Sequence, residues 1–150
     1  MTRGNEMTTE GTTTTELGYT ITRTFDAPVE KVWHVWTTPE HYAQWFNARP
    51  ESVRLDVRTG GSWESTLIAP DGSEYEMSGS YTEVEENKRM VMTMDAPGAE
   101  PSVMDFRLSE TGGKTQVVVS QECASVEERD MSKEGSEYLL ASFSDYLTKV

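Results

Sequence analysis

Apolar and polar residues alternate along most of the middle of the chain, and this period of two is typical of strands that bury one face. Gly60-Gly61 and Asp71-Gly72 interrupt the alternation. Such pairs favour two-residue hairpin turns because they tolerate positive φ. The pattern therefore predicts antiparallel strands. Seven segments follow it, at residues 19–25, 53–58, 63–67, 75–81, 90–94, 104–108 and 117–119.

The period changes after the first predicted strand. Apolar residues at positions 29, 32, 33 and 36 are spaced as on one face of a helix. Asp26 is a suitable capping residue and Pro28 suits a first turn, so the helix is predicted to begin near Ala27. Thr38-Pro39 repeats this signal and predicts a second short helix. Its apolar side would carry Tyr42, Trp45 and Phe46.

The helical period returns from about Ser125 or Met131 and predicts a long terminal helix. Residues 1–16 are rich in threonine and poor in apolar residues, so we expect a disordered leader followed by one domain over residues 17–150. The predicted fold class is α+β, a curved antiparallel sheet of about six or seven strands that grips the terminal helix. The apolar side of that helix would carry Leu139, Leu140, Phe143, Leu147 and Val150.

Residues 25–46 read F-D-A-P-x-E-x-V-W-x-x-W-T-x-P-E-H-x-x-x-W-F. This string resembles the opening motif of the START-like superfamily, in the SRPBCC branch related to activators of a heat-shock chaperone ATPase. Further segments resemble the same branch in the same order, at residues 55–63, 70–75, 79–84 and 112–115. The resemblance implies a helix-grip fold with two short helices after the first strand. It also implies a cavity that often holds an apolar ligand between the sheet and the C-terminal helix.

The charge balance narrows the range of partners. The chain has 150 residues, and 26 acidic against 13 basic side chains give a net charge of −13. Few basic side chains are therefore available to neutralise phosphate groups, which argues against nucleic acid and anionic membranes as partners. No apolar run approaches the roughly 20 residues that span a bilayer. Cys123 is the only cysteine, which excludes an intrachain disulfide and fits a reducing compartment, so we expect the cytoplasm.

Residues that carry catalytic or metal chemistry are sparse. His34 and His41 are the only histidines, both are predicted at the solvated surface, and neither has a metal-ligand spacing with Cys123. The serines lack a G-x-S-x-G elbow, and nothing in the sequence activates the thiol. Glu64 and Glu74 fall on the polar face of their strands. We therefore predict no catalytic residue, no metal and no cofactor.

Methionine is frequent in the predicted strands, and its flexible side chain suits a surface that accepts varied apolar shapes. The same residues could instead fill a packed core. Members of the resembled family often have Gly-Trp near the start of the terminal helix. This chain has Gly135-Ser136 there, which would enlarge a cavity or supply a polar contact if the serine faces the sheet. The predicted ligand-binding residues are Trp45, Phe46, Trp63, Met77, Tyr81, Met92, Met104, Ser136, Leu139 and Phe143.

Three functions follow from these observations. The first is binding of a small apolar or amphipathic molecule, polyketide-like or lipid-like, for sequestration, transport or resistance, by a monomer or homodimer. In that case replacing Phe143 by alanine should weaken binding more than folding stability. The second, which we rank lower, is a polyketide cyclase-like enzyme that positions its substrate. The third is a chaperone-associated module in the stress response, although the chain lacks the additional N-terminal domain of the eukaryotic co-chaperones.

Overall fold

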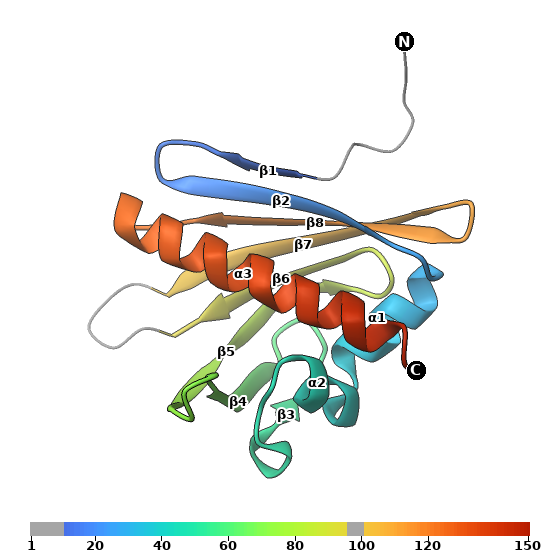
Figure 1. The fold of residues 1–150 in the computed structure, drawn as a ribbon, viewed down its shortest axis with the longest axis horizontal. Coiled ribbons are helices and arrows are strands. Elements are labelled where there is room, and N and C mark those ends of the chain that lie inside the picture. The colour runs from blue at the N-terminus through green and yellow to red at the C-terminus, as the bar shows by residue number, and fades with distance from the viewer. Residues whose placement is uncertain (1–10, 96–100) are drawn as a thin grey trace.

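The computed structural model describes residues 11–95 and 101–150. Within these ranges the chain forms one antiparallel sheet of eight strands, in the order β1-β2-β8-β7-β6-β5-β4-β3, and three α-helices. The sheet is curved, α3 crosses one of its faces, and α1 and α2 lie near the C-terminal end of α3 (Figure 1). The elements are β1 (Gly11–Thr14), β2 (Gly18–Phe25), α1 (Val29–Thr37), α2 (Pro39–Trp45), the 3₁₀-helix η1 (Pro50–Ser52), β3 (Arg54–Leu55), β4 (Ser62–Ile68), β5 (Glu74–Glu85), β6 (Arg89–Met94), β7 (Ser102–Thr111), β8 (Lys114–Glu122) and α3 (Val126–Leu147).

This arrangement confirms the predicted α+β fold and the antiparallel sheet that grips a long C-terminal helix. Of the predicted strand at residues 53–58, only Arg54–Leu55 is a strand, β3. The strand that the sequence did not predict is β1, which pairs antiparallel with β2 from Gly11 opposite Thr22 to Thr14 opposite Tyr19. Residues 11–14 are therefore a strand rather than part of a disordered leader, because β-branched threonines pair well along the open edge of β2. The rest of the predicted leader, residues 1–10, lies outside the described residues.

Helix α1 begins two residues later than predicted. Its N-cap is Pro28, and no side chain caps the helix from that position. The Val29 N–H donates instead to Glu110 Oε1 at 2.8 Å, and Glu110 lies near the end of β7. The first free donor of α1 is thus satisfied by a residue far along the chain, and the predicted cap residue Asp26 is not needed for it.

The hairpin between β7 and β8 sets the register at the centre of the sheet. Gly112 and Gly113 have φ of 60° and 80°, which suits a tight hairpin turn between strands with a right-handed twist. Thr111 lies opposite Lys114, and from there the pairing brings Phe106 opposite Val119. Both of these apolar residues are buried beneath α3.

Helix α3 has two different halves. It begins at Val126, where the Ser125 Oγ caps it by accepting from the Glu128 N–H at 3.1 Å, so the earlier of the two predicted starts holds. The buried residues of α3 are Leu140, Phe143 and Leu147, all in its second half. The first half carries no fully buried side chain. Within the described residues no helix is both long and apolar enough to cross a membrane.

Candidate binding cavity

A cavity of about 460 Å³ lies between α3 and the face of the sheet that this helix covers. Its wall combines strands β4 to β8 with residues from all three α-helices, and most of the lining side chains are apolar. The lining residues are Trp36, Tyr42, Trp45, Phe46, Trp63, Leu67, Met77, Tyr81, Met90, Met92, Met94, Ser102, Met104, Phe106, Val119, Gln121, Glu128, Met131, Ser132, Gly135, Ser136, Leu139 and Leu140.

Methionines form much of the sheet side of the cavity. Six of the eight methionines in the chain line it, five of them on β5, β6 and β7. Tyr81 on β5 pairs with Met92 on β6, which pairs with Met104 on β7, so these side chains form a row across three strands. Met90 is buried, whereas Met131 at the start of α3 is 75% exposed. The methionine lining thus extends from the core to the molecular surface.

Aromatic rings close the cavity where α1 and α2 meet the second half of α3. The Trp36 ring lies 5.2 Å from the Phe106 ring and 4.9 Å from the Phe143 ring. The Trp45 ring meets Phe143 edge-on at 5.2 Å, and its Nε1 donates to the Val35 carbonyl at 3.1 Å. Phe143 is 0% exposed and packs against these rings without lining the cavity. It belongs to the core that supports the aromatic end.

A hydrogen-bonded group of three polar side chains joins the sheet to α3 beside the cavity. The Tyr19 hydroxyl donates to Gln121 Oε1 at 2.5 Å and lies 2.8 Å from Ser136 Oγ. Because a tyrosine has one hydroxyl hydrogen, Ser136 donates to Tyr19 when Tyr19 donates to Gln121. Burial raises the pKa of Tyr19 to about 12, against a smaller lowering by the bond to Ser136. The group is therefore neutral near pH 7, and Gln121 and Ser136 face the cavity.

Two further tyrosines line the cavity, Tyr42 on α2 and Tyr81 on β5. The Tyr42 hydroxyl lies 3.1 Å from the Ser65 Oγ, and burial raises the pKa of Tyr42. Burial, with a smaller contribution from Asp56, also raises the pKa of Tyr81. Among the described residues the Tyr81 hydroxyl has no hydrogen-bond partner, although its side chain is buried and lines the cavity. A buried hydroxyl without a partner is a suitable group to bind a polar atom of a ligand.

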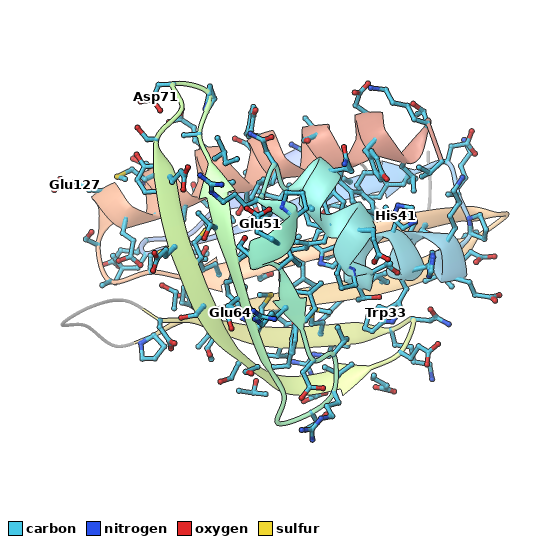
Figure 2. The ribbon with its side chains drawn as sticks, turned by 90° about the horizontal axis from the view of Figure 1, so that it is seen from below. Trp33, His41, Glu51, Glu64, Asp71 and Glu127 are labelled. Atoms are coloured by element: carbon cyan, nitrogen blue, oxygen red, sulfur yellow. The ribbon has the colours of Figure 1, made fainter. Side chains whose placement is uncertain are left out.

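Glu128 is the one ionisable carboxylate among the described lining residues. It also helps to begin α3, since its Oε2 accepts from the Ala124 N–H at a long 3.4 Å. Burial and the nearby Glu128 raise the pKa of the Cys123 thiol. Glu64 and Glu74 are exposed on the strands, as predicted, and neither lines this cavity. Figure 2 shows the position of Glu64.

Nine of the ten predicted ligand-binding residues line the cavity, and Phe143 is the exception. The lining residues that sequence reasoning missed include the polar residues Gln121, Ser132 and Glu128 and the aromatic residue Trp36. A signal for Gln121 was present, because the period of two from Val117 and Val119 puts it on the same face of the strand. No comparable signal exists for Glu128, whose position depends on where α3 begins.

The two histidines are near neighbours at the surface. Their rings lie 5.4 Å apart, His34 is exposed as predicted, and His41 is only half-buried. His41 differs from the prediction of a purely solvated side chain because its Nδ1 lies 2.7 Å from the Tyr146 hydroxyl on α3. Within the described residues no group of three or more histidine, cysteine or acidic side chains could hold a metal ion.

Comparison with known proteins identifies relatives of this fold. Residues 26–148 match the family model described as Activator of Hsp90 ATPase homolog 1-like protein. The crystal structure of protein Ms6760 from Mycobacterium smegmatis superposes with a TM-score of 0.76 and 22% identity, covering 90% of this chain and 93% of that one. An AHSA1-like protein from Aeromonas hydrophila gives a TM-score of 0.72 and 23% identity, with 87% and 92% covered. No curated protein matches.

Proposed function

Because the chain belongs to the Activator of Hsp90 ATPase homolog 1-like family, we propose that it uses the space between the sheet and α3 to bind a small apolar or amphipathic molecule. The observation that carries this proposal is the cavity of about 460 Å³ with an apolar wall and a few polar groups. Ligand pockets typically enclose roughly 300–1,000 Å³ and combine an apolar lining with a small number of polar groups that orient the ligand.

The distribution of the polar groups supports an amphipathic ligand over a purely apolar one. Gln121, Ser132 and Ser136 lie on the side formed by β8 and the first half of α3, whereas Trp36 and Trp45 line the end formed by α1 and α2. The Tyr81 hydroxyl on β5 is a further polar group of the lining. A molecule with one polar end and an apolar body would satisfy both ends at once. Ser136 occupies the position where a large aromatic residue was expected from the family resemblance, and a smaller side chain leaves room for such a molecule.

The biological role that we propose is sequestration or transport in the cytoplasm, by a monomer or homodimer. The single cysteine, Cys123, is free and buried, which is compatible with a reducing compartment. Polyketide-like and lipid-like molecules are the ligand classes to test first, because both combine an extended apolar body with a polar group. No lining residue gives a specific reason to prefer a cyclase or a chaperone-binding module.

An NMR titration would test the proposal. The methyl groups of the lining methionines and the indole groups of Trp45 and Trp63 would be followed against a panel of lipids, flavonoids, polyketides and sterols. We expect saturable shifts of these signals and smaller shifts of Trp33, which lies outside the cavity lining. The absence of saturable shifts for every compound would contradict the proposal.

A cavity-filling variant provides the matched control for that titration. Ser136→Trp places an indole in the cavity and should abolish the saturable shifts. Ser144→Trp adds the same group to an exposed position of α3 and should leave them unchanged. Far-UV circular dichroism would confirm that both variants are folded. Equal binding by wild type and Ser136→Trp would place the ligand elsewhere.

A further inference from the structure

The lining of the cavity carries a negative charge and no positive charge among the described residues. Among the described lining residues Glu128 is the sole charged side chain, and none is lysine, arginine or histidine. The whole chain carries a net charge of −13, so the long-range field adds to this local preference. An anionic ligand would therefore enter a site that offers it a carboxylate and no cation.

Arg129, the basic residue next in sequence to Glu128, forms its hydrogen bonds with other residues. Arg129 Nη1 donates to the carbonyls of Thr15 and Glu16 at 2.9 and 3.1 Å, and its Nε donates to Asp130 Oδ1 at 3.0 Å. Within the described residues no salt bridge reaches Glu128 within 4.0 Å, whereas eleven ion pairs form elsewhere. Among the described residues, the Ala124 N–H donates to the Glu128 carboxylate at a long 3.4 Å. Its carboxylate retains most of its capacity to accept from a cation.

Glu128 lies at one end of a long lining. At about 1.5 Å per helical residue, the stretch of α3 from Glu128 to Leu140 spans about 18 Å. Methionines of the sheet and the rings of Trp36 and Trp45 line the rest of the cavity. This layout fits an extended apolar body with a positive group at one end.

We propose, on the basis of the proposed binding function, that the cavity selects amine-bearing amphiphiles, with the ammonium group beside Glu128 and the apolar body among the methionines and aromatic rings. Amphiphiles with a carboxylate or phosphate at the same end are disfavoured. The selection is electrostatic: the ligand ammonium pairs with the carboxylate and the apolar part supplies most of the affinity.

Three probes with one apolar body and different head groups would test this selection. Dodecylamine, dodecanol and dodecanoate would be titrated below their micelle concentrations at pH 7, where the amine is protonated and the carboxylate ionised. Tryptophan fluorescence reports binding because Trp36, Trp45 and Trp63 line the cavity. We expect the amine to bind about tenfold more tightly than the alcohol, as a hydrogen bond to a charged group would give. The carboxylate should bind most weakly.

Two charge-neutralising variants at adjacent positions separate the effect of the carboxylate in the cavity lining from the effect of the protein's net charge. Glu128→Gln should weaken binding of the amine about tenfold and strengthen binding of the carboxylate, with the alcohol unchanged. Glu127→Gln removes the same charge from a side chain that points away from the molecule (Figure 2) and should change none of the three affinities more than about twofold. Glu128→Lys should invert the preference. Thermal unfolding of each variant would show that α3 remains folded.

The outcomes distinguish this inference from the proposed function. If dodecanoate binds the wild type as tightly as dodecylamine, or Glu127→Gln acts as strongly as Glu128→Gln, the amine selection is wrong while alcohol binding still supports a cavity. If none of the three probes binds and the wider panel also gives no saturable shifts, both proposals fall together. An amine preference that Glu128→Lys does not invert would also overturn the inference.

Discussion

The Tyr19 hydroxyl on β2 lies 2.8 Å from the Ser136 Oγ on α3, and this contact joins the second strand of the sheet to its last helix. The same hydroxyl donates to Gln121 on β8. Because all three groups are partly or fully buried, each depends on the others for its hydrogen bonds. The wall of the cavity is therefore fixed by polar contacts at a place where α3 has no fully buried apolar side chain.

Tyr19→Phe tests how much this contact contributes. Loss of the hydroxyl leaves Gln121 and Ser136 with one partner fewer, so the free energy of unfolding should fall by about 1–3 kcal/mol. Urea denaturation would measure it. Tyr138→Phe removes a hydroxyl from an exposed position of α3 and should have little effect. An equal loss in the two variants would mean that the buried contact contributes no more to the free energy of unfolding than an exposed hydroxyl does.

Alkaline pH should destabilise the fold through its buried tyrosines. Burial raises the pKa of Tyr19 to about 12 and also raises those of Tyr42 and Tyr81. An unfolded tyrosine ionises near pH 10, so the unfolded state loses protons first. The stability from these tyrosines is fully present below about pH 10 and is lost as the pH rises towards 12. Denaturation midpoints between pH 9 and 12 should fall, and less steeply in Tyr19→Phe. A flat profile would contradict the burial of these groups.

Phe143→Ala should act on stability more than on binding, which reverses the expectation from sequence. Phe143 is 0% exposed and contacts the rings of Phe25, Trp36 and Trp45, so its removal leaves a core void. We expect a loss of about 3–5 kcal/mol. Leu139→Ala, which shortens a half-buried residue in the cavity lining, should cost less stability and more affinity. Denaturation and ligand titration on both variants would check this crossed pattern.

Two substitutions compare how much Glu110 and Asp26 each stabilise the start of α1. Glu110→Ala removes the carboxylate that accepts from the Val29 N–H at 2.8 Å and should lower stability by about 0.5–2 kcal/mol. Asp26→Ala removes the residue that the sequence favours as the cap, and no side-chain cap bond is lost. Its effect should be close to zero. A larger loss for Asp26→Ala in chemical denaturation would show that the local signal is correct.

The sequence predicted this fold well because its signals were local and repeated. Alternation gave the strands, glycine pairs gave turns, and Leu140, Phe143 and Leu147 gave the buried side of α3. The errors have a shared cause, which is that the decisive partner is distant in sequence. The cap of α1 is 81 residues away at Glu110, and β1 depends on pairing with the open edge of β2.

The cavity was predicted less completely for the same reason. A helical pattern shows which side of α3 faces the sheet, but it does not show how far the sheet lies below each turn. Phe143 therefore had the same sequence signal as Leu139, although the first is in the core and the second lines the cavity. Glu128 gave no signal as a lining residue, since its sequence context is that of an ordinary first-turn acid.

The unequal burial along α3 has a kinetic consequence. Its second half is held by Leu140, Phe143 and Leu147, whereas its first half is held by contacts such as those from Arg129 to the carbonyls of Thr15 and Glu16. Segments with few buried apolar contacts open at a lower free energy than the whole molecule. Amide hydrogen exchange should therefore be faster before Gly135 than after it. Under the proposed binding function, we expect the cavity to open by local fraying of the first turns of α3 rather than by unfolding of the whole molecule.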